Sequence, residues 1–212
     1  MSDIAVTLVD SMGTDLTIVN SARVSFGKKV DTFDIEKDSR LIRYLAKHKH
    51  FSPFNHAFAS FHVKAPIFVA RQLVKHEYLV WNEISRRYVA SDPEFYNPVL
   101  REATKDKKQG SGCEMGLPKL EGIIKQSNDD ASQRYKYLLS MGVCEEQARV
   151  VLPLNHMTEW YWSGSLGAFA KMCNLRCTGD TQGETRIVAD QIDNMMLNLF
   201  PIAWDALTNE DE

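Results

Sequence analysis

The sequence predicts an α+β fold, in which a small sheet is packed with several helices. Three observations support this prediction. Residues 57–63 (AFASFHV) alternate apolar and polar side chains, as a half-buried strand does. Residues 34–49 and the stretch from Ile187 to Leu199 repeat apolar side chains at helical spacing. Because the 212 residues contain no internal repeat and no clear linker, we expect a single domain over residues 1–212.

In the first half of the chain, short strands and helices are expected to alternate. Pro53 disfavours helix at the residue before it, and Pro66 suits the first turn of a helix. The expected elements, in order, are a strand at 5–9, a turn at 11–13, a strand or short helix at 16–26, a helix at 34–49, a loop at 50–57, a strand at 57–63 and a helix at 66–76.

The second half is expected to be mostly helical. Residues 101–116 are rich in Gly, Ser and Lys without an apolar period, which indicates a loop. Pro153 stops the helix before it. The expected elements are helices at 117–140 and 145–152, an aromatic strand at 156–165, a helix at 166–176, a turn at 176–184 and a long amphipathic helix from about Ile187 to Leu199.

Charge and composition narrow the class of protein. The net charge is −3 and the pI about 6.1, so the chain as a whole does not attract nucleic acid, and an anion site must be a local cluster of Arg and Lys. No apolar run approaches the roughly 20 residues that span a bilayer. The N-terminal residues lack the basic and apolar regions of a signal peptide. We therefore expect a cytoplasmic protein that binds neither membrane nor nucleic acid.

The four cysteines do not form a Cys-x-x-Cys pair. Cys173 and Cys177 are four residues apart and would share a face if the helix continued that far. We interpret all four as reduced thiols rather than as metal ligands or disulfides. The histidines do not follow a zinc-protease pattern, and no metal site is predicted.

A charged segment, residues 75–88 (KHEYLVWNEISRRY), follows one of the most apolar runs in the chain. In a helix, Gln72 and His76 would share one face, next to the face of Arg71 and Lys75. Arginine forks match phosphate oxygens, and an amide can recognise the edge of a base. The alternative from spacing alone is a solvated helix end with internal ion pairs.

Residues 71–88 resemble the signature of the flavin-dependent thymidylate synthases. That signature is Arg-His-Arg, then seven residues containing Ser and Asn-Glu, then Ser and, two residues on, Arg. Further segments resemble the same family in order and at similar spacing: LVDSMGTDLTIVNSARVSF, HFSPFNHAFASFHVKAPIFVARQ, RVVLPLN, NLRC and QGETR. The resemblance covers nearly the whole chain.

The resemblance implies a fold like that of the thymidylate synthase-complementing proteins, with a mainly antiparallel sheet. It implies synthesis of dTMP from dUMP, with methylenetetrahydrofolate as carbon donor, reduced FAD as hydride donor and NADPH as reductant of the flavin. It also implies a homotetramer whose active sites lie where subunits meet.

For the nucleotide, the resemblance implies one set of residues. In the family, the arginine matching Arg176 faces the uracil ring and favours ionisation at N3. The expected catalytic residues are Arg176 and Ser85. From the residues alone, Arg149 and Arg176 would equally suit surface or helix-end cations. The expected substrate-binding residues are Gln72, Lys75, Glu83, Ser85, Arg86, Arg87, Arg149 and Arg176.

For the flavin, the sequence departs from the family pattern. The Arg-His-Arg triplet reads Lys75-His76-Glu77, which removes one guanidinium fork and reverses one charge. Val80 replaces the usual Ser, and Ser165 begins a segment that is Asn-x-Arg in many members. The expected cofactor-binding residues are His50, Ser52, Lys75, His76, Glu77, Glu83, Ser165 and Lys171.

These departures leave three outcomes for FAD. It binds with rearranged partners, such as Lys75, Lys171 and the Lys105–Lys108 loop; it binds weakly and only with nucleotide present; or the cofactor chemistry has changed. We favour the first. Two interpretations of the loop at 106–112 stay open: contacts with anionic groups of folate or FAD, or a solvated loop without a ligand.

Two other functions stay open from the sequence. One is a pyrimidine-nucleotide C5 hydroxymethylase or a dCMP-directed variant on the same scaffold, which Val80 and the changed flavin positions motivate. The other is a catalytically inactive nucleotide-binding or assembly protein.

Overall fold

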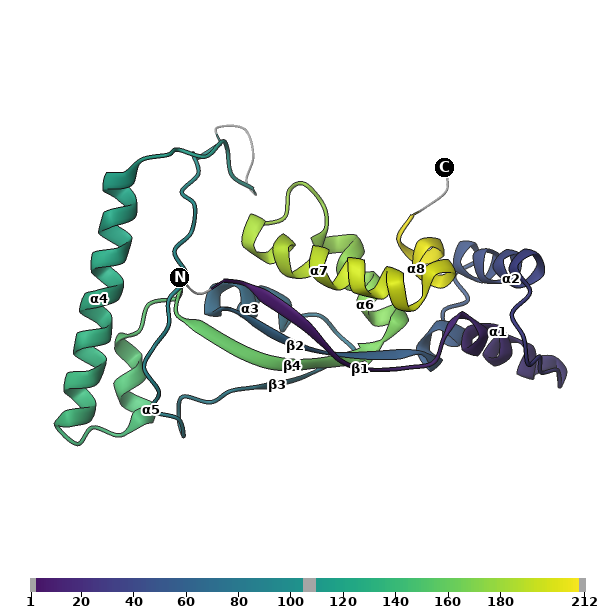
Figure 1. The fold of residues 1–212 in the computed structure, drawn as a ribbon, viewed down its shortest axis with the longest axis horizontal. Coiled ribbons are helices and arrows are strands. Elements are labelled where there is room, and N and C mark those ends of the chain that lie inside the picture. Colours follow the sequence, from purple (N-terminus) through teal and green to yellow (C-terminus); the bar gives the residue numbers. More distant parts are fainter. Residues whose placement is uncertain (1–2, 105–109, 210–212) are drawn as a thin grey trace.

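The computed structural model describes residues 3–104 and 110–209. Its centre is a four-stranded sheet in the order β1-β2-β4-β3, with every neighbouring pair antiparallel (Figure 1). The strands are β1 Ala5–Met12, β2 Phe58–Pro66, β3 Leu79–Glu83 and β4 Met157–Ser165. This confirms the predicted α+β class.

Helices account for most of the remaining described structure. The α-helices are α1 Asp15–Arg23, α2 Ile35–Lys47, α3 Ile67–Leu73, α4 Pro118–Ser140, α5 Glu145–Ala148, α6 Leu166–Arg176, α7 Gly183–Leu199 and α8 Pro201–Thr208. Three 3₁₀ helices are η1 Val24–Phe26, η2 Ser52–His56 and η3 Arg149–Val151. None of the helices in the described part of the chain has the length and apolarity needed to cross a membrane.

The core lies between the sheet and the helices α6, α7 and α8, which run over one of its faces (Figure 1). Alternate residues of β2 and β4 point into this core, as the period of a strand requires. Phe61 of β2 lies opposite Trp162 of β4, and its ring meets that of Phe169 on α6 edge to face at 5.2 Å. The same alternation in the sequence predicted β2 correctly.

Strand β3 was not predicted, and it changes the geometry of the charged segment. The helix expected over residues 66–76 ends at Leu73, because the chain must turn back to pair with β4. Tyr78 takes a left-handed conformation, with φ of 64°, at the start of β3. Trp81 then stacks on Trp160 at 4.3 Å between ring centroids. The apolar residues inside the charged segment are therefore sheet residues.

The segment at 16–26, left open between strand and helix, is helical. Thr17 accepts a hydrogen bond from the backbone N–H of Thr14 at 3.0 Å, which fixes the first turn of α1. The buried Asp15 carboxylate accepts from the N–H groups of Ile202 and Ala203, each at 3.0 Å, at the start of α8. Burial raises the pKa of Asp15 despite these bonds. One carboxylate thus joins the first helix to the last, which the sequence did not predict.

Helices α4 and α5 form an arm beside the sheet (Figure 1). A chain of amides ties α4 to the loops around Asn97 and before β4: Asn128 of α4 donates to Asn97 at 3.0 Å, and Asn155 donates to Asn128 at 2.9 Å. Asn155 also donates to the carbonyl of Tyr96 at 2.8 Å. The predicted helix at 117–140 is confirmed as α4, whereas the helix at 145–152 is α5 followed by η3.

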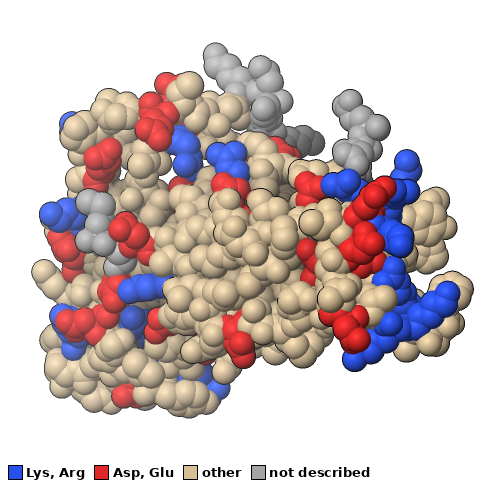
Figure 2. All heavy atoms as spheres, turned by 45° about the vertical axis from the view of Figure 1, so that its right-hand side comes forward, with Lys and Arg blue, Asp and Glu red and all other residues tan. Residues whose placement is uncertain are grey.

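Surface charges are mixed rather than segregated by sign. Figure 2 shows Lys and Arg side chains gathered toward one edge of the face in view, with Asp and Glu side chains beside them. On α2, Lys37 pairs with Asp34 at 3.9 Å and Arg43 pairs with Asp205 of α8 at 3.6 Å.

Candidate active site

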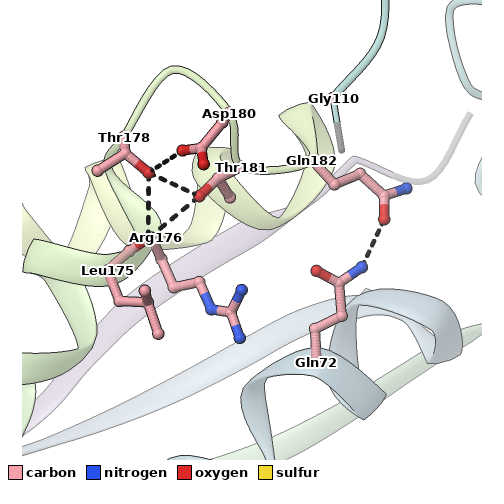
Figure 3. A pocket seen from close by; sticks show the side chains of 8 residues that line it. All are labelled: Gln72, Gly110, Leu175, Arg176, Thr178, Asp180, Thr181 and Gln182. Carbon is pink, nitrogen blue, oxygen red and sulfur yellow. Dashed lines mark hydrogen bonds between the residues drawn. The ribbon is translucent and has the colours of Figure 1, made fainter. Parts of the chain in front are cut away.

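A cavity of about 450 Å³ lies where α3, the end of α6 and the start of α7 meet. Figure 3 shows the guanidinium of Arg176 and the amides of Gln72 and Gln182 around it. Its lining residues are Gln72, Gly110, Leu175, Arg176, Thr178, Asp180, Thr181 and Gln182. The fold therefore brings together two residues predicted from distant segments, Gln72 and Arg176.

The Arg176 side chain is held by a third predicted residue. Its Nε–H donates to Nε2 of His76 at 3.1 Å. Burial, and then the positive charges of Arg176 and Lys171, lower the pKa of His76 to about 4. At neutral pH His76 is therefore uncharged, with Nε2 as acceptor and its proton on Nδ1. The terminal nitrogens of Arg176 stay available to a ligand in the cavity.

The Gln72 amide is fixed at both of its ends. Its nitrogen donates to the side-chain oxygen of Gln182, and its oxygen accepts from the hydroxyl of the buried Thr185 at 3.2 Å. Gln182 and Thr185 were not singled out in the sequence, although both lie in the segment QGETR that resembles the family. Gln182 is 110 positions from Gln72, and no local pattern could have linked them.

The turn after α6 forms one wall of the cavity. The carbonyl of Leu175 accepts from the hydroxyls of Thr178 and Thr181, both at 3.2 Å, and Thr178 also contacts Asp180 at 2.6 Å. These bonds satisfy a carbonyl at the end of the helix, as side chains commonly do there. The wall next to Arg176 is thus ordered by hydroxyl groups.

Arg101, in the loop before α4, is attached to α7 by an ion pair with Glu184. Arg101 donates to both oxygens of Glu184, at 2.7 and 2.8 Å, and Glu184 is buried. A side chain at the neighbouring Gly183 would meet the Arg101 guanidinium at 2.8 Å. The pair therefore fixes the start of α7 beside Gln182.

A second group of predicted residues gathers around the end of β3 and helix α5, and we call it the basic cluster: Glu83, Ser85, Arg86, Arg87 and Arg149. Arg87 pairs with Glu146 at 3.3 Å, and Arg149 donates to the backbone carbonyl of Glu146 at 3.2 Å. Both guanidinium groups are exposed. The cluster thus offers two solvent-facing cations, Arg87 and Arg149, which both contact Glu146.

The remaining members of the basic cluster are held more firmly. Glu83 accepts from Thr158 at 2.7 Å and from the indole of Trp81 at 3.1 Å. Ser85 accepts from the N–H of Arg87 at 3.2 Å, which tightens the turn after β3. Arg86 donates to the carbonyl of Ser91 at 2.9 Å and lies over the ring of Tyr135 at 5.9 Å.

A histidine that the sequence reasoning missed lies near the basic cluster. Burial, together with the charges of Arg86 and Arg149, lowers the pKa of His156. Its Nδ1 is 2.8 Å from the carbonyl of Pro153, and this contact favours the protonated Nδ1 tautomer. His156 is therefore neutral at pH 7.

Within one chain, the cavity and the basic cluster are separate. Glu83 contacts Thr158, whereas the His76 ring lies 6.5 Å from the ring of Trp162. Thr158 and Trp162 are four positions apart on β4, or about 13 Å at the usual rise of a strand. A ligand that contacts both the cavity and the basic cluster must span this separation, or a second chain must supply one of the two sets of residues.

The predicted flavin residues do not gather at one place. His76, Lys75, Glu77 and Lys171 lie near the cavity, the last three exposed. His50 lies parallel to Tyr44, 6.4 Å away, at the end of α2, and Ser52 begins η2. The buried Ser165 hydroxyl donates to Asn55 at 2.7 Å and caps α6 at 3.3 Å. The Lys105–Lys108 loop lies outside the described residues.

Three comparisons relate this geometry to known proteins. The profile of the thymidylate synthase complementing protein family matches residues 7–202. A flavin-dependent thymidylate synthase of Thermus thermophilus is 41% identical over 202 residues, covering 95% of this chain and 74% of the relative. One from Thermosipho africanus is 40% identical over 203 residues, covering 94% of this chain and 88% of the relative.

A solved structure agrees over almost the whole length. The UMP/dUMP methylase PolB of Streptomyces cacaoi, bound with 5-Br dUMP, superposes with a TM-score of 0.89 at 32% identity. The match covers 98% of this chain and 95% of the methylase.

Proposed function

The chain belongs to the thymidylate synthase complementing protein family, that of the flavin-dependent thymidylate synthases, and on this premise we propose that it converts dUMP to dTMP. It is a methyltransferase that uses a flavin. The proposed carbon donor is methylenetetrahydrofolate, and the proposed reductant of the flavin is NADPH.

The observation that carries the proposal is the cation held at the cavity. Arg176 is half-buried and fixed through Nε by the neutral His76, so its terminal nitrogens can face a pyrimidine carbonyl without moving. A guanidinium stays protonated at any working pH. Negative charge that develops on the uracil ring as C5 becomes nucleophilic is therefore stabilised by a preorganised partner. In this proposal Gln72, fixed by Thr185 and Gln182, orients the same ring.

The basic cluster supports a place for the nucleotide phosphate. Arg87 and Arg149 are exposed, and the carboxylate that pairs with Arg87 is itself half-exposed, so a phosphate dianion can compete for the fork. Glu83 and Ser85 lie beside them and suit contacts to sugar hydroxyls. We assign Lys75 and Arg86 to the same substrate set.

The side chains near the cavity fit an anionic cofactor in part. Lys75 and Lys171 are exposed cations close to His76 and could hold the FAD phosphates, and when bound the flavin supplies the hydride. Ser165 fits less well, because its hydroxyl is already engaged with Asn55 and Ala168. His50, Ser52, Glu77 and Glu83 stay predictions from the resemblance.

We further propose a homotetramer in which one chain completes the site of another. The separation of the cavity from the basic cluster by about 13 Å along β4 supports a site that draws these groups from different subunits. A cytoplasmic location and the absence of nucleic-acid partners stay predictions from the sequence.

The test is identification of the product. Purified protein would be incubated with dUMP, methylenetetrahydrofolate, FAD and NADPH, with dCMP or UMP replacing dUMP in parallel reactions. We expect dTMP from dUMP, no product from dCMP, and no product without FAD. UMP is included because PolB is described as a UMP/dUMP methylase. A 5-hydroxymethyl product, or turnover of dCMP with dUMP inert, would contradict the proposal.

A further inference from the structure

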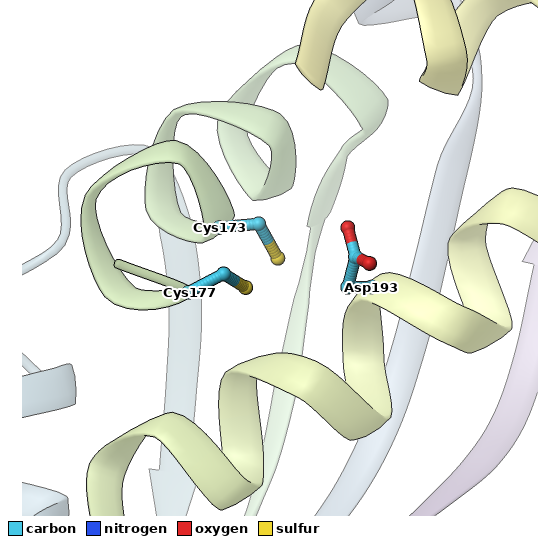
Figure 4. Close-up of side chains that lie close together, drawn as sticks. All are labelled: Cys173, Cys177 and Asp193. Atoms are coloured by element: carbon cyan, nitrogen blue, oxygen red, sulfur yellow. The ribbon is translucent and has the colours of Figure 1, made fainter. Parts of the chain in front are cut away.

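Behind the wall of the cavity, α6 and α7 bring two thiols and a carboxylate together. Cys173 and Cys177 come from the end of α6 and Asp193 from α7, and their ligand atoms lie within 4.8 Å of one another. Figure 4 shows both sulfur atoms and the carboxylate turned toward the same point between the helices. No part of the proposed reaction uses these three groups.

The spacing of the cysteines suits a shared ligand. They are four residues apart, and α6 ends at Arg176 with Cys177 as its C-cap, so both thiols lie on one side of the helix end. Two side chains at this spacing on a helix can bind one zinc ion, as the histidines of the His-Glu-x-x-His motif do. The third donor comes from a different helix, and binding would therefore join α6 to α7.

The carboxylate is already oriented by a second contact. The indole of Trp204 donates to Oδ1 of Asp193 at 2.9 Å, which leaves Oδ2 for another partner. Among the described residues, no ion pair is formed by Asp193. Hydrogen bonds of this kind to a ligating side chain are typical of metal sites, where they fix its orientation.

The burial of the three groups gives an ion access from one side. Cys173 is buried, whereas Cys177 and Asp193 are partly exposed, so an ion can enter from their side and keep a water as its fourth ligand. Thiolates with a carboxylate select a borderline-soft divalent ion over Mg²⁺ or Ca²⁺.

We propose that Cys173, Cys177 and Asp193 form a binding site for a divalent ion of the Zn²⁺ class. Binding converts two thiols to thiolates, forms two metal–sulfur bonds and one metal–oxygen bond, and releases two protons to solvent. Because Cys177 directly follows Arg176, the ion also ties the peptide that carries the cavity cation to α7.

The experiment uses Co²⁺ as a spectroscopic probe on the full-length protein, kept reduced with a non-chelating phosphine. Tetrahedral Co²⁺ bound to thiolate gives charge-transfer absorption that free Co²⁺ lacks, and Zn²⁺ should displace it. We expect one Co²⁺ per chain. Cys177→Ser and Asp193→Asn should each weaken binding by more than about tenfold, because each removes a ligand from a three-donor site.

The matched controls are Cys113→Ser and Cys144→Ser, which remove exposed thiols elsewhere in the chain. They should leave the charge-transfer band and the stoichiometry unchanged. Asp193→Asn serves as the second variant if Cys177→Ser does not fold, since the amide keeps the size of the carboxylate.

Three results would overturn the proposal. The first is the absence of thiolate-to-Co²⁺ absorption in the reduced wild-type protein. The second is a band that persists in Cys177→Ser and Asp193→Asn, and the third is a band that disappears in either control. None of these depends on turnover, so the site can fail while the proposed synthase activity stands.

Discussion

At the scale of single residues, the proposed function depends on how Arg176 is held. A mobile arginine would lose side-chain entropy on meeting each substrate, whereas the bond from its Nε to His76 fixes it in advance. His76 can accept that bond only while it is neutral, and its burial beside Arg176 and Lys171 keeps it so. The residue retained from the family's Arg-His-Arg triplet therefore has a second use, as the acceptor that positions the cavity cation.

This arrangement predicts a dependence of stability on pH. The pKa of His76 is about 4 in the folded chain and about 6.5 in the unfolded chain, so between these values only the unfolded chain binds the proton. Stability should therefore fall as the pH is lowered from about 7 toward about 4. In His76→Gln, whose side chain does not titrate, we expect a shallower fall in the free energy of unfolding, measured by urea denaturation at several pH values. Equal slopes for the two proteins would show that His76 is not held neutral.

At the scale of elements, the pairing of β3 with β4 sets the positions of the two ends of the charged segment at residues 75–88, one near the cavity and the other in the basic cluster. Leu79 lies opposite Gly164, and Glu83 lies opposite Trp160. His76 precedes this pairing, and Ser85 follows it. The close approach at Gly164 is what allows β3 to begin directly after the turn at Tyr78.

Gly164→Ala should therefore disturb the sheet edge. A Cβ there would lie 2.4 Å from Leu79 Cδ2 and 3.0 Å from the carbonyl of Tyr78, so the Leu79 side chain must move aside and the carbonyl must yield by a few tenths of an ångström. We expect a loss of about 1–3 kcal/mol in the free energy of unfolding, as for other overpacked sites. The control is Gly122→Ala in α4, where a Cβ meets nothing within 4 Å and helix propensity should add about 0.5–1 kcal/mol. A Gly164→Ala protein as stable as wild type would refute the close approach.

The ion pair between Arg101 and Glu184 is the second element-scale contact that can be tested. Arg101→Met would leave the carboxylate of Glu184, whose side chain is only 2% exposed, without its partner. Breaking a buried pair in this way costs about 3–5 kcal/mol. Arg134→Met removes a pair at 3.6 Å whose side chains are 67% and 42% exposed, and should change stability by less than about 1 kcal/mol. Thermal unfolding would compare the two, and similar losses would contradict the assignment.

At the scale of the whole molecule, one chain holds the cavity and the basic cluster in separate places. The cavity on the helix side of the sheet carries Arg176 and Gln72, and the basic cluster lies around the end of β3 and α5. In the proposed tetramer, a nucleotide site could draw the two sets of residues from different chains.

The mass of the assembly tests this directly. Light scattering during size-exclusion chromatography should give about four times the chain mass of 24.1 kDa, and turnover should fall when dilution dissociates the assembly. A monomer with full activity would mean that one chain contains a complete site.

The sequence predicted the fold where local pattern determines it. The apolar period of α2 and α7 and the alternation in β2 depend on burial of one face, and they were read correctly. Strand β3 was missed because its five residues lie among charges and are defined only by pairing with β4. The short helix α8 was missed for a similar reason, since its start is fixed by the distant Asp15.

The candidate site was predictable in part and for a different reason. Gln72, His76 and Arg176 could be selected by resemblance; in the structure Gln72 and Arg176 line one cavity, and His76 holds Arg176 there. Gln182, Thr185 and His156 could not, because their relevance comes from contacts between distant segments.

The most direct test of the account is the release of tritium from dUMP labelled at C5, with methylenetetrahydrofolate, FAD and NADPH, by the wild-type protein and by Arg176→Ala. If a fixed guanidinium polarises the ring, wild type should release tritium, and the variant should lose at least about a hundredfold in rate, as when one preorganised donor is removed from an active site, while keeping its oligomeric state. Tritium release by Arg176→Ala at close to the wild-type rate would contradict the account.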